Sequence, residues 1–372
     1  MTKKILFITE DYICGGVATV SQTLKQAINL DCNYQMDIGL LNSRNDYAGF
    51  KPVFILNQHE AKNKVMKLFR LFSDSLKLSR KISGYDIIIV NGDLFQVVIP
   101  VWIFSLFKKI RVIAWVHACL DKVKYYPNQL IKSIHCIGLK SFTQIVCVSH
   151  ESARSLAAYA GAEISTRIEV IYNPFIITEL EKALPIADLD NRKIKIIVLG
   201  RLVAEKNFAL LIRALSMLQN KNLQLIICGE GSEKNALIEE AIALNVYEQL
   251  LFVGQTDNPL GYIAASDILV STSTTEALPS VIIEALALSK VIIATDTGAR
   301  EILTHGCGVI IPVNEPAILA QAIEKVINDE LLRKQLIQNR HLALKPFMIE
   351  NVIPYWLKTF ARLFENDAKN LY

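Results

Sequence analysis

The chain has 372 residues, a length that predicts two domains of ordinary size with a boundary near the middle. With 52% hydrophobic and 20% charged residues, the composition excludes a disordered or fibrous protein. The net charge of +4 is too small to indicate nucleic acid or an acidic polymer as a partner. The charge is unevenly distributed, however, because residues 1–175 carry 21 basic and 13 acidic side chains and residues 176–372 carry 19 and 23.

Three features of the sequence bear on the compartment of the protein. The first ten residues contain no apolar run long enough for a signal peptide, so we expect a cytoplasmic protein. The most apolar window, residues 87–107, includes Asn91, Asp93, Gln96 and Pro100, and it predicts a buried strand, a loop and a helix better than a membrane span. The seven cysteines lack C-x-x-C spacing, which predicts reduced core residues.

Short runs rich in Ile, Val and Leu recur between amphipathic stretches of helix length, a pattern typical of βαβ units with parallel sheets. We expect strands at residues 4–9, 34–40, 53–56, 86–90, 110–116, 144–148 and 168–171, and then at 194–199, 223–228, 250–253, 267–270, 291–294 and 308–311. The sequence therefore predicts an α/β protein of two doubly wound, Rossmann-like domains that face each other across a cleft, with ligands beyond the carboxyl ends of the strands.

The domain boundaries follow from this series of strands. The first domain is expected to cover residues 1–175 and the second to cover residues 193–350. The polar stretch 176–192 has no strand pattern and predicts a linker. Residues 351–372 predict a C-terminal helix that packs back on the first domain.

Two basic residues follow the strand expected at 194–199. Gly200 allows the backbone to turn, and Arg201 and Lys206 are expected beside a helix N-terminus, where free N–H groups already favour anions. The arrangement predicts a clamp for a diphosphate. The alternative is an ordinary strand-to-helix turn with two solvated cations.

Two carboxylates, Glu276 and Glu284, are separated by seven residues. Pro279 fits the first position of a helix, so Glu276 is expected in the preceding loop and Glu284 on the helix, on the same side as Ser280. Eight positions span roughly 12 Å in a helix, whereas the carboxyl groups of a glycoside hydrolase lie only about 5–9.5 Å apart. We therefore expect the two carboxylates to hold opposite ends of one elongated ligand, the alternative being a capped helix with a favourable acid near its N-terminus.

Pairs of glycines follow two further strands, at Gly15-Gly16 and at Gly229 and Gly231. Glycine lets the backbone approach a phosphate or a sugar closely, although such pairs also occur in simple turns. Neither pair completes the dinucleotide-binding pattern G-x-G-x-x-G.

The order and spacing of these motifs resemble the second domain of family 4 retaining glycosyltransferases, which have the GT-B fold. The motifs are Gly200-Arg201, Glu205-Lys206, Gly229-Glu230-Gly231 and the E-x7-E pair of Glu276 and Glu284. The resemblance covers residues 193–312 and is looser over the first domain.

The resemblance implies a role for each matching residue. Arg201 and Lys206 would bind the nucleotide diphosphate, Glu284 the ribose hydroxyls, and Glu276 the transferred sugar. His117, at the end of the strand expected at 110–116, matches a histidine that hydrogen-bonds the donor sugar, the alternative being a strand-end histidine satisfied by backbone. The remaining donor-binding residues would be Gly15, Gly16, Gly200, Gly229, Gly231, Ala277, Leu278, Pro279 and Ser280. Ala277 stands where the family has glycine, so its methyl group should narrow the approach of the backbone to the donor.

No metal or cofactor is expected. The only Asp-x-Asp sequence, Asp188 to Asp190, lies in the expected linker and does not follow a strand. The cations of the clamp would take the place of Mg²⁺.

The basic excess of the first half is concentrated in residues 62–72, which predict an amphipathic helix. Such a helix is typical of a membrane surface or a partner interface, the alternative being a solvated helix over a core. Because many members of the family glycosylate lipid-linked acceptors, the resemblance favours docking on anionic lipid. The residues assigned to membrane or acceptor contact are Lys62, Lys64, Lys67, Phe69, Arg70 and Phe72.

With the resemblance, the sequence predicts a retaining glycosyltransferase, peripheral on the inner face of the membrane. It would move a sugar from a nucleoside diphosphate donor, a UDP-sugar, to a glycan or lipid-linked glycan in surface polysaccharide or glycolipid synthesis. One alternative is a nucleotide-sugar epimerase or phosphorylase on the same fold, and another is a non-enzymatic anion- or nucleic-acid-binding protein. No zinc knuckle, RNA-stacking motif or helix-turn-helix spacing supports nucleic acid as a partner.

Overall fold

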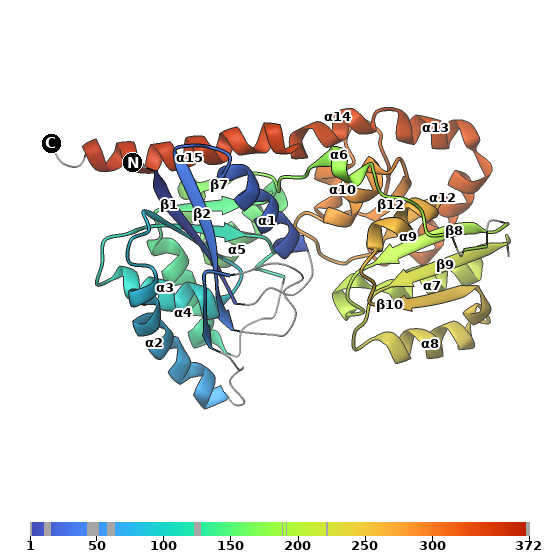
Figure 1. Cartoon of the computed structure of the whole chain (residues 1–372). Helices are drawn as coiled ribbons and strands as arrows, with labels where there is room; N and C mark the ends of the chain where they lie inside the picture. Colours follow the sequence, from blue (N-terminus) through green and yellow to red (C-terminus); the bar gives the residue numbers. More distant parts are fainter. Residues whose placement is uncertain are drawn as a thin grey trace. The chain divides into compact units, whose positions relative to one another are not determined.

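The computed structural model divides into two α/β units, residues 1–175 with 349–372 and residues 176–348. It describes residues 2–10, 16–42, 52–57, 64–122, 128–187, 189–190, 192–220 and 222–369, and only the backbone of residues 64–72 and 366–369. Each unit is built around one sheet (Figure 1).

In the described part of the first unit, the sheet has seven strands in the order β3-β2-β1-β4-β5-β6-β7, and all of its strand pairs are parallel. Its order reverses between β1 and β4, as in a doubly wound fold. The strands are β1 (Lys3–Thr9), β2 (Tyr34–Asn42), β3 (Phe54–Asn57), β4 (Ile87–Asn91), β5 (Arg111–Val116), β6 (Gln144–Cys147) and β7 (Ile168–Val170). The helices are α1 (Gly16–Ile28), α2 (Lys64–Lys81), α3 (Phe95–Ser105), α4 (Gln129–Ser141), α5 (His150–Ala160) and α15 (Ile349–Lys369).

Side chains that alternate along β1 separate the two faces of this sheet. Leu6 and Ile8 belong to a hydrophobic core with residues of α2, α3, α4 and α5. Phe7 lies between them in sequence and contacts Trp115, with 5.6 Å between the ring centroids. Both faces are therefore buried, which explains why the strands are nearly continuous apolar runs.

Helix α15 closes the second face of the sheet and contacts α1 (Figure 1). Trp356 and Phe360 are fully buried, and the ring of Trp356 lies 5.2 Å from that of Trp115. One turn further along α15, the Thr359 hydroxyl donates to Glu169 Oε2 at 2.8 Å, and Arg362 forms an ion pair with the same oxygen at 2.6 Å. The C-terminal helix thus belongs to the first unit, and it begins at Ile349, two residues before the expected start.

The sheet of the second unit has six strands in the order β10-β9-β8-β11-β12-β13, again all parallel. They are β8 (Ile194–Leu199), β9 (Leu223–Cys228), β10 (Leu250–Gly254), β11 (Ile268–Ser271), β12 (Val291–Thr295) and β13 (Val309–Ile311). The helices are α6 (Ile177–Leu180), α7 (Phe208–Met217), α8 (Lys234–Ala243), α9 (Pro259–Ala265), α10 (Ser280–Ala287), α11 (Ala299–Ile302), α12 (Pro316–Asn328), α13 (Glu330–Gln338) and α14 (Arg340–Leu344), with a short 3-10 turn at Ala204–Lys206.

The predicted fold class, two doubly wound α/β domains, is confirmed, and a strand occurs at every expected position. Some details differ. The stretch 176–192 belongs to the second unit, where it begins with α6 and where the Ile186 N–H donates to the Gly261 carbonyl at 3.1 Å. Pro279 is the N-cap of α10, not its first helical residue.

The apolar window at residues 87–107 forms β4 and α3, as predicted. Among the helices that the structure describes, none combines the length and the apolar character needed to cross a membrane. Of the described cysteines, Cys119, Cys147, Cys228 and Cys307 are buried and outside any disulfide, but Cys32 is exposed, contrary to the expectation of core residues throughout. Cys14 lies outside the described residues.

The docking of α15 can be tested at neighbouring aromatic residues. Trp356→Ala should lower the free energy of unfolding of the first unit by about 3–5 kcal/mol, because it removes a fully buried indole. Tyr355→Ala is the control, since Tyr355 is 58% exposed and its truncation should cost no more than about 0.5 kcal/mol. Denaturant titration of the full chain measures both, and equal effects would contradict the described packing.

Candidate active site

Loops that follow neighbouring strands meet at the carboxyl edge of the second sheet. The strand order reverses between β8 and β11, and the loop after β8 carries Arg201 and Lys206 while the loop after β11 carries Glu276. Such a reversal is where open α/β sheets bind their ligands. The sheet therefore brings together Lys206 and Glu276, which lie 70 positions apart in sequence, and places Arg201 on the same loop as Lys206.

An ion pair joins the two loops. Lys206 Nζ contacts Glu276 Oε1, and the Ser273 hydroxyl donates to the same oxygen at 2.9 Å. The side chains of Lys206 and Glu276 are 25% and 17% exposed. Arg201 is exposed, and none of the described residues forms an ion pair with it. The edge therefore offers one free guanidinium beside a lysine that is already held by a carboxylate.

Hydrogen bonds to backbone groups also join the two loops that carry the ion pair. The Thr272 hydroxyl donates to the Lys206 carbonyl at 2.8 Å, and the Thr274 N–H donates to the Glu205 carbonyl at the same distance. The positions of Lys206 and Glu276 are thus set by hydrogen bonds that do not involve their charges. A ligand can compete for Lys206 without dismantling the loops.

The glycines of the site are required by contacts between loops. A Cβ atom at Gly229 would lie 1.9 Å from the carbonyl oxygen of Gly200, and one at Gly231 would lie 2.2 Å from that of Leu202. Both Gly200 and Gly229 have φ of 142°, which side chains rarely permit. The loops after β8 and β9 therefore pack backbone against backbone. This contact is sufficient to explain why Gly229 and Gly231 are glycines, without contact to a ligand.

Gly298, after β12, is a site residue that the sequence analysis missed. Its N–H donates to the Glu276 carbonyl at 3.0 Å, and a Cβ atom there would lie 2.1 Å from the Ala277 carbonyl oxygen. The signal was available, because a glycine shortly after a strand often marks a close approach. Thr275 was also missed, and its buried hydroxyl lacks a hydrogen-bond partner among the described residues.

Ala277 and its neighbours are largely enclosed. Ala277 and Leu278 are 4% and 8% exposed, and the φ of Ala277 is not positive. The alanine that replaces the family's glycine therefore adopts a backbone that any residue accepts. Its methyl group is buried in the protein.

Glu284 lies on α10 and is half-buried. Burial raises its pKa to about 7, and a hydrogen bond with the Ser280 side chain lowers the pKa in part. The predicted placement of Glu284 on the Ser280 side of the helix is found in the structure.

In the first unit, His117 follows β5 and packs against Trp115, with 4.4 Å between the ring centroids and an interplanar angle of 49°. Its Nε2 atom is buried without a hydrogen-bond partner in the described part of the chain, and burial lowers the pKa of His117 to about 3. The ring is therefore neutral at physiological pH. Gly16 is the exposed first residue of α1, and Gly15 lies outside the described residues.

The predicted membrane or acceptor residues are placed in backbone only. Lys64, Lys67, Phe69, Arg70 and Phe72 lie on α2, and Lys62 lies outside the described residues. Their assignment stays a prediction. In the segment expected to be the linker, Asp190 pairs with Arg192 at 3.0 Å, and Asp188 lies outside the described residues.

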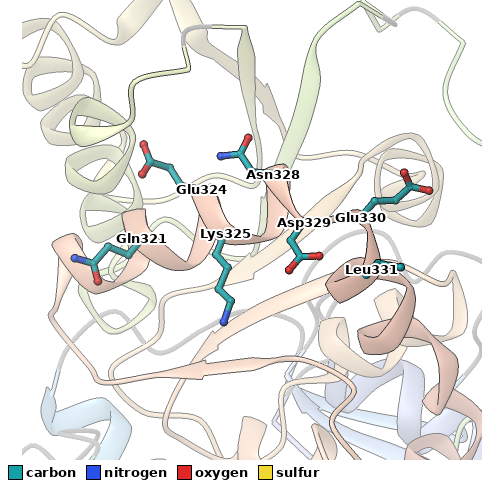
Figure 2. Close-up of a pocket in the computed structure, with 7 residues that line it drawn as sticks. All are labelled: Gln321, Glu324, Lys325, Asn328, Asp329, Glu330 and Leu331. Atoms are coloured by element: carbon teal, nitrogen blue, oxygen red, sulfur yellow. The ribbon is translucent and has the colours of Figure 1, made fainter.

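A surface depression of 640 Å³ lies where α12 meets α13 (Figure 2). A second hollow beside it includes Leu223, the first residue of β9, so this region is at the amino edge of the sheet. The polar side chains around the depression in Figure 2 do not converge on one point. The depression is therefore separate from the site at the carboxyl edge.

Comparison with known proteins identifies the class of the chain. Residues 181–342 match the family of glycosyl transferases group 1. An uncharacterized glycosyltransferase of Methanocaldococcus jannaschii is 26% identical over 82% of this chain and 87% of its own. The amylovoran biosynthesis glycosyltransferase AmsD of Erwinia amylovora is 24% identical over 91% and 93%. The crystal structure of Anabaena HepE in complex with UDP and glucose superposes with a TM-score of 0.82 at 20% identity, covering 96% of this chain and 99% of that one.

These matches and the two doubly wound sheets define the chain as a glycosyltransferase with the GT-B fold. The match to the family of glycosyl transferases group 1 lies within the second unit. The class of enzyme predicted from the sequence is confirmed.

The raised pKa of Glu284 can be tested through the pH dependence of stability. Because the folded protein binds this proton more tightly than the unfolded chain, the carboxyl group destabilises the fold progressively as the pH rises from 4.5 toward about 7. In Glu284→Gln this loss should disappear, so the melting temperature of the variant should exceed that of wild type above pH 7 and approach it below pH 4.5.

The control for this experiment is Glu239→Gln, which removes an exposed carboxylate from α8 in the same unit. Its melting temperature should follow that of wild type at every pH. A constant offset between Glu284→Gln and wild type across the pH range would contradict the burial of Glu284.

Proposed function

We propose that this glycosyltransferase is a family 4 enzyme that uses a nucleoside diphosphate sugar, a UDP-sugar, retains the anomeric configuration and needs no metal. The observation that carries the proposal is the pairing of Lys206 with Glu276 beside the exposed Arg201, at the edge where the strand order reverses. Two cations at this edge suit a diphosphate. Structures of HepE with UDP and with UDP-glucose add support from the fold.

In this mechanism, Arg201 and Lys206 neutralise the charge that develops on the departing diphosphate as its bond to the sugar breaks. Lys206 carries three N–H donors, so it can keep Glu276 and bind a phosphate oxygen at the same time. Glu276 accepts hydrogen bonds from the sugar, and Glu284 accepts them from the ribose. Fixed charges and positioning supply most of the catalysis.

The first unit, with His117, is assigned to the transferred sugar and the acceptor. Several relatives are named for glycan or lipid-linked acceptors. One of them, the N-acetylgalactosaminyltransferase of Campylobacter jejuni that acts on a diphospho-undecaprenol glycan, is 34% identical over 49% of this chain and 50% of its own. We extend this chemistry to the present chain and propose a glycan or lipid-linked glycan as its acceptor.

The clamp is tested by substitution of its cations. Arg201→Ala and Lys206→Ala should each lower the rate of sugar transfer by roughly 10²–10³-fold, because each removes charge stabilisation of the leaving group. Lys334→Ala is the matched control, since it breaks only an exposed pair with Glu330 on α13. Near wild-type turnover of both clamp variants would refute the assignment.

The donor is tested by thermal shift, and the type of reaction is tested by the requirements of the transfer assay. UDP should raise the melting temperature more than GDP or ADP, because a ligand that binds only the folded state stabilises it. Transfer that requires an acceptor separates the enzyme from an epimerase, and independence of inorganic phosphate separates it from a phosphorylase. Activity in EDTA and an unchanged anomeric configuration of the product test the remaining parts of the proposal.

A membrane-facing surface is proposed on the side of the first unit that α2 and α3 cover. Leu106 and Phe107 follow α3, are 63% and 85% exposed, and are succeeded by the exposed Lys108 and Lys109. On the neighbouring α2, Leu76 is 68% exposed. Apolar side chains flanked by lysines suit the interface of an anionic bilayer.

Phe107→Asp should reduce co-sedimentation with phosphatidylglycerol vesicles at low salt several-fold, because it places a charge where an aromatic ring would insert. Leu30→Asp is the control. Leu30 is 89% exposed, but it follows α1, which packs with β2 and α15. Equal binding of both variants, or no binding by wild type, would reject the surface.

A further inference from the structure

Asp93, which follows β4, is a buried carboxylate without a cation. It is 7% exposed, and no basic side chain of the described residues pairs with it. Burial raises its pKa to about 7, although two backbone hydrogen bonds lower the pKa in part. A carboxylate in such a place is unfavourable unless its hydrogen bonds are well satisfied.

Its partners are the backbone N–H groups of His117 and Ala118, at the point where the chain leaves β5. Asp93 Oδ1 accepts from His117 at 3.0 Å and from Ala118 at 3.1 Å, and Oδ2 lies 3.1 Å from the His117 nitrogen. One oxygen therefore serves both donors. These bonds fix the backbone that carries the His117 imidazole.

The turn that bears Asp93 is itself held on several sides. The Asn91 side chain accepts the Asp93 N–H at 3.2 Å, and the Gly92 N–H donates to the Trp115 carbonyl at 2.8 Å. The ring of the buried His135 lies 3.1 Å from the Gly92 carbonyl oxygen. Asp93 is thus a rigid anchor for the neighbouring strand end.

The His117 ring needs an anchored backbone because, among the described residues, none forms a hydrogen bond with its Nε2 atom. The ring packs against Trp115 at an interplanar angle of 49°, and this contact supplies no hydrogen bond to Nε2. A ring nitrogen that is buried without a partner is costly, and a ligand or a water normally satisfies it. The direction of the imidazole therefore depends on the backbone at residue 117.

We propose that Asp93 is a positioning residue for sugar transfer, which holds the end of β5 so that the His117 imidazole meets the transferred sugar. The inference rests on the proposed function, because it takes His117 as a sugar contact. It adds that Asp93 acts through its hydrogen-bonding oxygen and not by moving a proton.

Two substitutions of Asp93 distinguish these roles. In Asp93→Asn the amide oxygen can take the place of Oδ1 and accept both N–H groups, so kcat should remain within several-fold of wild type. Asp93→Ala leaves both groups without an acceptor and should lower kcat by roughly 100-fold with little change in KM for the donor, as expected for a misplaced contact. If Asp93→Asn were as inactive as Asp93→Ala, the carboxyl group would be acting in proton transfer and the proposal would be wrong.

The matched control is Asp86→Ala. Asp86 precedes β4, and its carboxylate also accepts a backbone N–H, from Lys4 at 2.8 Å, but at the opposite end of the strand. This variant should lower stability without changing kcat. A loss of kcat equal to that of Asp93→Ala would show a general structural effect and would reject a specific role for Asp93.

A double-mutant cycle with His117→Ala completes the test. If Asp93 acts through His117, then Asp93→Ala should have little further effect on kcat in the His117→Ala background, and additive losses would overturn the proposal. Retention of UDP-induced thermal stabilisation shows that each variant is folded. If wild type transfers sugar and His117→Ala does so equally well, this inference fails while the proposed function stands. Absence of transfer by wild type from any nucleotide sugar would instead reject the proposed function.

Discussion

The ion pair between Lys206 and Glu276 is the interaction on which the site depends, because it joins the loops that follow β8 and β11. These are the two strands between which the strand order of the sheet reverses. The pair lies partly enclosed, where removing charges from water offsets much of their attraction. The net contribution of the ion pair to the stability of the fold is therefore small. The pair holds a cation and a carboxylate ready beside each other, one suited to phosphate and the other to hydroxyl groups.

The loops can carry this pair because their backbones are fixed independently. Thr272 and Thr274 bind the loop of Lys206, and Gly298 binds the carbonyl of Glu276. Gly229 and Gly231 let the next loop pack without any side chain between the two. The chemistry of the site thus rests on a scaffold of main-chain contacts, which a ligand does not need to rearrange.

In the first unit, main-chain hydrogen bonds also fix the end of a strand, here β5. There the Asp93 carboxylate accepts the main-chain N–H groups of His117 and Ala118, beside an imidazole whose pKa is lowered by burial to about 3.

The sequence predicts the strands well because each is a short apolar run closed by a turn, a local signal. Arg201, Lys206, Glu276 and Glu284 are candidates from sequence because of their spacing along the chain, and the structure pairs two of them, Lys206 and Glu276. Asp93 could not be found in this way. In the sequence it is only a charge that interrupts an apolar window, and its partners lie 24 and 25 positions away. Likewise, the segment expected to be a linker has no strand pattern, and its hydrogen bond from Ile186 to Gly261 joins residues 75 positions apart, so the sequence does not predict that it joins the second unit.

The return of α15 to the first unit has a consequence for how the chain folds during synthesis. The second unit is continuous in sequence and is complete before the ribosome has made Trp356. Until then Trp115 and the sheet face around it lack the cover that α15 provides, so the first half of the protein is the last to finish folding although it is the first to be made. Nascent chains truncated before α15 would carry an open apolar sheet face, a surface that chaperones bind.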